Sequence, residues 1–187
     1  TPVIIGVAES GLVTCHDLKG VNLWYSSFNW NVGDITMDGE GNALLLACFG
    51  QGVVRFDLNG VREGTYRIDS SPCRVAIDFE GSRILAASIE RNLTELDFEG
   101  AIRAEQMLSD RPVGLAMDAL GRYAVVAFGA GELQFLRLPD FFNSDEREPA
   151  KKKPVSGGSN PEPRWETRVA YNAEEVKSAV LETVPQQ

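Results

Sequence analysis

Histidine and cysteine are scarce in this chain of 187 residues, which contains one histidine and three cysteines. The cysteines, Cys15, Cys48 and Cys73, form no C-x-x-C pair, and no histidine stands at metal-ligand spacing from them. A disulfide framework and a zinc site are therefore not indicated, and no metal is predicted. The compartment cannot be read from the sequence, although this cysteine usage favours a reducing, cytoplasmic one.

Recognisable catalytic sets are missing as well. The sequence contains no H-E-x-x-H motif, and a Ser-His-Asp set could be built only with His16, the single histidine. A phosphate-binding glycine loop is not indicated either, because the Gly-x-Gly stretches fall in expected hairpin turns with no helix behind them. His16 is expected to be a packed, hydrogen-bonded side chain rather than a general base. Cys73, beside Pro72, is the cysteine that a loop could expose to redox chemistry. The sequence predicts no catalytic residue and no cofactor.

Long apolar runs and an excess of basic residues are absent too. No apolar run approaches the roughly 20 residues that cross a bilayer, so no membrane span is expected. The net charge is −9, and the chain before residue 143 holds 19 acidic against 11 basic residues. This acidity disfavours binding to a phosphate backbone, so nucleic acid is not an expected partner.

What the chain does contain is a repeat of 40 residues. Two sets of aspartates recur at this spacing, each followed three residues later by glycine: Asp17, Asp57 and Asp97 with Gly20, Gly60 and Gly100, and Asp38, Asp78 and Asp118 with Gly41, Gly81 and Gly121. Self-similarity at a fixed period of this length is typical of repeat architectures. The repeated turns are predicted to be structural, because aspartate caps a turn through the backbone and glycine supplies the positive φ.

Each 40-residue row holds four short segments that alternate with Gly, Asn and Asp. In the second row they lie at 33–38, 43–49, 53–58 and 62–68. Such spacing predicts consecutive antiparallel hairpins. The second segment of each row is almost wholly apolar and the fourth is polar, as expected when sheets stack face to face and the fourth strand lies outermost. The predicted fold class is all-β: a β-propeller made of four-stranded antiparallel blades.

The segment AIDFEGSRILAASIERNLTELDFEG, residues 76–100, resembles a degenerate blade of the WD-repeat and quinoprotein-like propeller superfamily. The segment DLKGVNLW, residues 17–24, is similar to the D-x-x-G-x-x-x-W ending of quinoprotein-type blades. The Gly-His pair of WD repeats is absent, and four residues replace the tryptophan that precedes the strand-end aspartate: His16, Phe56, Leu96 and Leu136. The resemblance covers residues 3–138 and implies a propeller, but this superfamily hosts too many activities to imply one of them.

Under four full blades are predicted in residues 1–142, because the first row lacks its innermost strand. Propellers close with about four to eight blades. The chain is therefore expected to be the C-terminal part of a larger propeller. Two alternatives are completion of the ring by a second copy or a partner in a larger assembly, and closure as a four-bladed ring.

The composition changes after residue 142. Residues 143–164 are rich in Pro, Gly, Ser and charge, which predicts a linker or surface loop. Within 165–187, residues 165–171 alternate in polarity and could supply the missing outer strand of the last blade. Asn172 then resembles the start of a short helix.

The candidate site residues cluster where innermost strands begin. Asp34, Arg74 and Arg111 are expected to place polar groups at a channel mouth that could take a ligand or peptide. Trp30 is a candidate aromatic contact for a partner. The function expected is a non-catalytic interaction or sensing platform for a protein or peptide. The alternative is a ligand-binding or enzymatic propeller whose catalytic residues lie on blades outside this chain.

Overall fold

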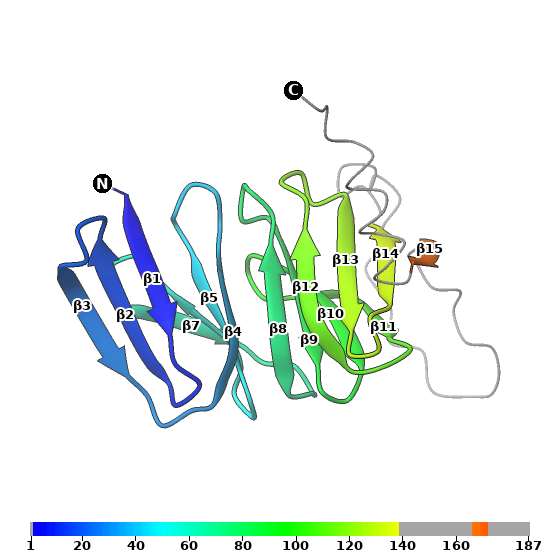
Figure 1. Ribbon diagram of the computed structural model, residues 1–187, viewed down its shortest axis with the longest axis horizontal. Helices are drawn as coiled ribbons and strands as arrows, with labels where there is room; N and C mark the ends of the chain where they lie inside the picture. Colours follow the sequence, from blue (N-terminus) through cyan, green and yellow to red (C-terminus); the bar gives the residue numbers. More distant parts are fainter. Residues whose placement is uncertain (1, 139–165, 172–187) are drawn as a thin grey trace.

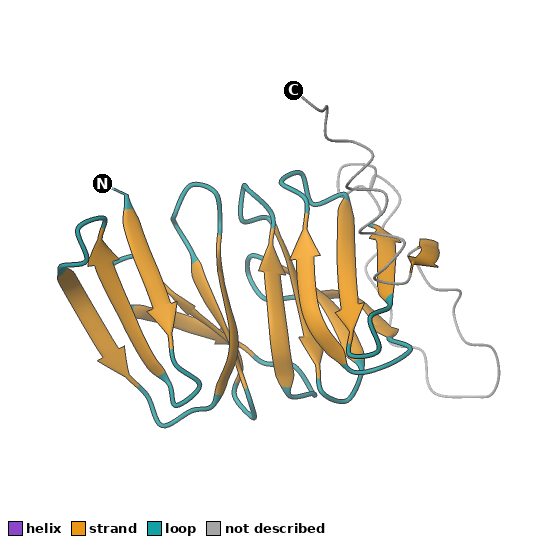
Figure 2. Cartoon of the chain, viewed as in Figure 1, coloured by secondary structure: helices purple, strands orange, loops and turns teal. Residues whose placement is uncertain are grey.

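The computed structural model describes residues 2–138 and the backbone of residues 166–171. Within these ranges the chain forms four antiparallel sheets and no helix (Figures 1 and 2). The first sheet comprises β1 (Val3–Val7), β2 (Leu12–Asp17) and β3 (Asn22–Ser27). The second comprises β4 (Val32–Met37), β5 (Leu44–Cys48), β6 (Gly52–Phe56) and β7 (Arg62–Tyr66). The third comprises β8 (Pro72–Ile77), β9 (Arg83–Ser88), β10 (Asn92–Asp97) and β11 (Ile102–Met107). The fourth comprises β12 (Pro112–Met117), β13 (Tyr123–Phe128), β14 (Leu133–Arg137) and β15 (Glu166–Tyr171).

Each sheet is a simple meander in which consecutive strands pair. β15 takes the fourth place in the fourth sheet, with Leu133 of β14 opposite Tyr171 and Arg137 opposite Glu166. This is the place that the alternation within 165–171 predicts. The linker expected at 143–164 and the helix expected after Asn172 lie outside the described residues.

The sheets follow one another along the molecule, and their first strands lie side by side (Figure 1). β8 contacts β4 on one side and β12 on the other, and β1 contacts β4. The predicted all-β repeat of antiparallel, four-stranded sheets is therefore present, with a three-stranded sheet at its N-terminal end.

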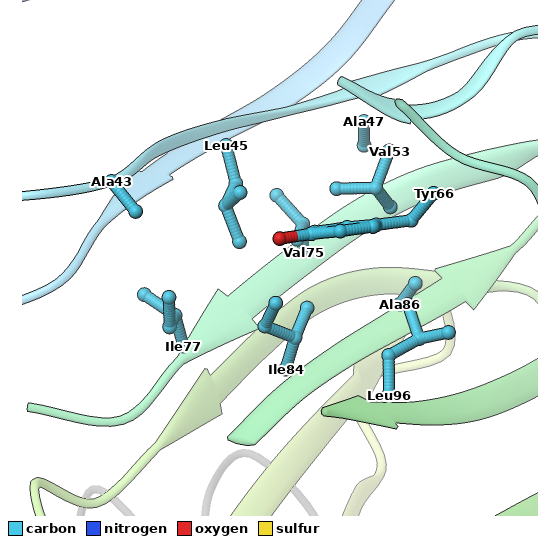
Figure 3. Close-up of a cluster of buried hydrophobic side chains, with 10 residues drawn as sticks. All are labelled: Ala43, Leu45, Ala47, Val53, Tyr66, Val75, Ile77, Ile84, Ala86 and Leu96. Atoms are coloured by element: carbon cyan, nitrogen blue, oxygen red, sulfur yellow. The ribbon is translucent and has the colours of Figure 1, made fainter. Parts of the chain in front are cut away.

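The core lies between the sheets rather than within one layer. Figure 3 shows the cluster between the second and third sheets, where Leu45 and Val53 of the second face Ile84 and Ala86 of the third. β5 and β9 are buried on both faces, as the sequence predicts. The same prediction is wrong for β13, where buried and more exposed residues alternate. Among the described sheets, none covers the face of β13 that carries Tyr123, and Tyr123 is 54% exposed.

The repeated Asp-x-x-Gly turns are structural, as predicted. Asp57 Oδ1 accepts the amide of Val61 at 2.7 Å, and Asp17 and Asp97 bind their own turns in the same way. The Val61 amide is the main reason why the pKa of Asp57 lies below its ordinary value. The glycine that closes the Asp57 turn, Gly60, has a φ of +79°, which other residues adopt only with strain.

Aromatic side chains of the outer strands connect neighbouring sheets through these turns. Trp24 Nε1 donates to Leu58 O at 2.8 Å, and Tyr66 Oη donates to Phe98 O at 2.5 Å. Each ring lies against the turn glycine of the next sheet, so that a Cβ at Gly60 would lie 2.8 Å from the Trp24 ring. We call these two contacts the aromatic staples. β11 has no aromatic residue, and its interface with the fourth sheet instead contains the buried Arg83–Glu95 ion pair.

Candidate functional site

A groove of about 650 Å³ lies where the N-terminal ends of β4, β8 and β12 meet. Its walls come from all four sheets or the loops between them, and two of its side chains are the arginines Arg74 and Arg111. Glu9 and Asn31 add further polar groups, and Phe49 adds an apolar surface. We call this hollow the arginine groove.

Arg74 is held in the groove by backbone carbonyls of three sheets. Its Nε donates to Val113 O at 2.7 Å, and its Nη1 donates to Gly33 O at 3.0 Å and to Cys73 O at 2.5 Å. Its Nη2 donates to none of the described residues. The guanidinium group is thus fixed in place with one nitrogen still available to a ligand.

Glycine at position 33 allows β4 to approach β8 closely. A Cβ there would lie 2.8 Å from Cys73 O and 3.0 Å from Cys73 Cα. Because both close atoms belong to the backbone, a side chain could be accommodated only by separating the two strands. The carbonyl of Gly33 would then move away from Arg74, so this glycine also supports the groove.

Of the four predicted site residues, the structure brings only Arg74 and Arg111 to the groove. Asp34 is the third residue of β4 and lies nearby, but its two carboxylate oxygens accept backbone amides: Oδ2 that of Val75 at 3.1 Å and Oδ1 that of Ile35 at 2.9 Å. Asp34 therefore joins β4 to β8 rather than lining the groove.

Trp30 lies outside the groove, in the packing between the first and second sheets. Its ring stacks on Phe28, with centroids 4.8 Å apart and an interplanar angle of 6°, and the Arg62 guanidinium lies 5.0 Å from its centroid. Its partly buried ring also packs against the core cluster. The structure thus gives Trp30 a packing role.

The polar groove residues that the sequence analysis missed are Glu9 and Asn31. Glu9 lies in the turn between β1 and β2 and Asn31 in the loop before β4, and nothing in their local sequence separates them from other loop residues. His16 is half-buried, and its Nδ1 lies 3.3 Å from Gly20 O, which gives it the hydrogen bond that was expected.

The hypothesis of an exposed, redox-active Cys73 is wrong. Cys73 lies within β8, is only 3% exposed and places its Sγ 3.9 Å from Pro112 O. Burial raises the pKa of its thiol, although the nearby charges of Arg74 and Arg111 oppose that rise. Burial also raises the pKa of Cys48, to about 11. Both thiols are therefore protonated and shielded near neutral pH.

We expect the folded chain to resist alkylation by iodoacetamide at pH 8 at all three cysteines, since all are buried. Mass spectrometry before and after unfolding in urea measures this, and the unfolded chain is the control. Rapid native alkylation of Cys73 would contradict its assigned burial.

Because the pKa of Cys48 in the folded chain lies above its value in the unfolded chain, the free energy of unfolding should fall as the pH rises from about 9 to 11.

Within the described part of the chain, His, Cys, Asp and Glu side chains nowhere gather in threes around a common point that could hold a metal. That part also contains no helix of the length and apolarity that a bilayer crossing requires. The described residues define an all-β protein of stacked antiparallel sheets, with the arginine groove at the N-terminal ends of β4, β8 and β12.

Of the comparisons with known proteins, the one with solved structures agrees with that class. No protein-family model and no curated protein matches the sequence. Among solved structures, one described as Kuenenia stuttgartiensis hydrazine synthase is similar, with a TM-score of 0.52 and 20% sequence identity. The match covers 57% of this chain and 32% of that one, so this chain corresponds to about a third of its length. At this identity the similarity shows a shared fold alone.

Proposed function

We propose that this chain is a segment of a β-propeller, of the WD-repeat and quinoprotein-like kind, that acts as a non-catalytic platform. Its arginine groove binds an acidic segment of a protein or peptide. The observation that carries the proposal is the Arg74 guanidinium, which three sheets hold in place while Nη2 remains available in the groove. The 40-residue register and the contacts between successive first strands support the propeller architecture.

The groove suits a short stretch of polypeptide in size and chemistry. Ligand sites commonly measure about 300 to 1,000 Å³, and this groove lies within that range. An arginine held by other contacts loses little side-chain entropy when it binds a carboxylate, and hydrogen bonds between two charged groups are the stronger ones. Arg111 adds a second positive charge beside the same hollow.

The remaining charges of the molecule make such binding selective. Glu9 lies in the groove, and the chain as a whole is acidic. The net negative charge of the chain therefore repels acidic peptides in general. An acidic peptide is attracted only where it contacts the arginines of the groove. Because the groove is open to solvent, the attraction should weaken as salt is added.

We expect a fluorescein-labelled hexaglutamate peptide to bind the full chain at low salt, and Arg111→Gln to weaken that binding about tenfold through loss of one charge-assisted contact. Fluorescence anisotropy measures both. The matched control is Arg122→Gln, which removes the same charge from a second hollow at the opposite end of β8. Hexalysine tests the opposite charge preference.

Two results would overturn the proposal. One is the absence of saturable hexaglutamate binding to the unmodified chain. The other is an equal loss of affinity in Arg111→Gln and Arg122→Gln, which would indicate a response to net charge rather than to the groove.

A further inference from the structure

Arg91 has a backbone conformation that favours glycine. It closes the turn between β9 and β10, and its φ of +69° is the one positive φ of a non-glycine among the described residues. Turns of the same kind follow β1 and β13, where the amide of the fourth turn residue also donates to the carbonyl of the first. The fourth residue of those turns is a glycine, Gly11 or Gly131. Because a left-handed backbone strains any residue that has a Cβ, Arg91 is a costly choice at this position.

The contacts of Arg91 with the described residues do not offset this strain. Its Nη1 lies 3.4 Å from Ser109 O, which is long for a hydrogen bond, and it forms no ion pair with a described residue. The neighbouring carboxylates of Glu90 and Asp110 each accept a backbone amide, at 2.9 and 2.7 Å. The Arg91 side chain is exposed, so its charge is available to a ligand. Strained backbone of this kind is common at ligand-binding positions.

The Arg91 turn lies at the same end of the sheets as the arginine groove. Ser88, at the end of β9, lies opposite Pro72, where β8 begins. Arg111 of the loop between β11 and β12 lines the groove, and the Arg91 guanidinium contacts Ser109 of the same loop. These two loop residues are two positions apart, so at most about 7 Å separates their Cα atoms. One short loop therefore connects Arg91 to the groove.

We propose that Arg91 is a second contact for the acidic segment that the arginine groove binds. The segment lies along the loop between β11 and β12, with one carboxylate in the groove and another on the Arg91 guanidinium. This inference rests on the proposed function and adds to it the length of the partner's acidic stretch, which extends beyond the groove. The strained turn then serves binding at the expense of stability.

Two contacts on one segment strengthen each other. Once a carboxylate is bound in the groove, a second carboxylate of the same segment meets Arg91 at a high effective concentration. Hydrogen bonds between a guanidinium and a carboxylate are also stronger than those between neutral groups. A segment that reaches both contacts therefore depends on Arg91 for part of its affinity, whereas a segment that fills only the groove does not.

The test compares fluorescein-labelled dodecaglutamate with hexaglutamate on the full chain at low salt. We expect Arg91→Gln to weaken dodecaglutamate binding about five- to tenfold and hexaglutamate binding less than twofold, as measured by fluorescence anisotropy. Arg122→Gln is the matched control, because it removes the same charge at the opposite end of β8. It should change the binding of either peptide less than twofold.

Arg91→Gly separates binding from stability. It removes the same charge as Arg91→Gln but relieves the left-handed strain, so its urea midpoint should exceed that of Arg91→Gln by about 0.3 to 1 M. Both variants should bind dodecaglutamate equally weakly, because neither has the guanidinium. A residue that served the fold alone would not give a variant that is more stable and yet binds less well. Circular dichroism verifies that both variants fold.

Unchanged binding of dodecaglutamate to folded Arg91→Gln and Arg91→Gly chains would overturn this inference. An equal loss in Arg91→Gln and Arg122→Gln would also overturn it, since the response would then be to net charge. Either result leaves hexaglutamate binding in the groove intact. Failure of hexaglutamate to bind the unsubstituted chain would instead overturn the proposed function, and this inference with it.

Discussion

Glu95→Leu is expected to lower the free energy of unfolding by about 3 to 5 kcal/mol, the cost of leaving one charge of a buried ion pair without its partner. Arg83 Nε lies 3.1 Å from Glu95 Oε1, and the two side chains are 4% and 3% exposed. Arg83 also donates to Gly121 O in the turn that follows β12. Loss of Glu95 would leave a buried guanidinium at the interface between the third and fourth sheets. Urea unfolding followed by circular dichroism measures the change.

The chain offers a matched control in a second Arg–Glu pair. Arg55 Nε lies 2.6 Å from Glu63 Oε2, but these side chains are 21% and 36% exposed. Because water and salt screen such a pair, Glu63→Leu should cost about 1 kcal/mol or less. The double variant Arg83→Met/Glu95→Leu should recover most of the stability lost in Glu95→Leu, since neither charge of this buried pair remains. Equal costs for Glu95→Leu and Glu63→Leu would contradict the assigned burial.

Gly100→Ala is expected to destabilise the chain by about 2 to 4 kcal/mol, of which roughly 1 to 2 kcal/mol arises from its left-handed backbone. The φ of Gly100 is +87°. The remainder arises from the aromatic staple, because a Cβ at Gly100 would overlap Cδ1 of Tyr66. The ring could move only by stretching its hydrogen bond to Phe98 O. Thermal and urea unfolding measure the cost.

Gly20→Ala separates the two contributions. Gly20 closes the same kind of turn with a φ of +82°, but nothing lies within 4 Å of a Cβ placed there. Its substitution should therefore cost only the backbone strain. In a double-mutant cycle, Tyr66→Leu should remove the additional cost at Gly100. If Gly20→Ala and Gly100→Ala cost the same, the staple contributes nothing beyond the turn.

Features that depend on neighbours along the chain could be predicted from the sequence. The Asp-x-x-Gly turns bond within four residues of themselves, so Asp57 and Gly60 could be assigned from their types and spacing alone. The meander of each sheet follows from short strands joined by tight turns. Sheet β12–β15 is a partial exception, because its fourth strand follows β14 only after a gap that no local pattern bridges.

Features that depend on approach between sheets could not be predicted in the same way. Asp34 and Arg74 occupy the same position in consecutive rows, yet Asp34 bonds to amides while Arg74 extends into the groove. Their roles differ because a short carboxylate reaches only the adjacent strand, whereas a guanidinium reaches carbonyls on both sides. Cys73 likewise looks like a loop residue beside Pro72, but packing of β8 between β4 and β12 buries it.

The sequence by itself determined the period, the order of strands and turns, and the four-segment pattern of each row, because these follow from backbone preferences and from apolar periodicity over a few residues. The tertiary structure decided which faces are covered and which arginines meet in one groove. Those outcomes depend on distances between residues about 40 positions apart, where the identity of the facing side chain, such as Tyr66 against Gly100, selects the contact.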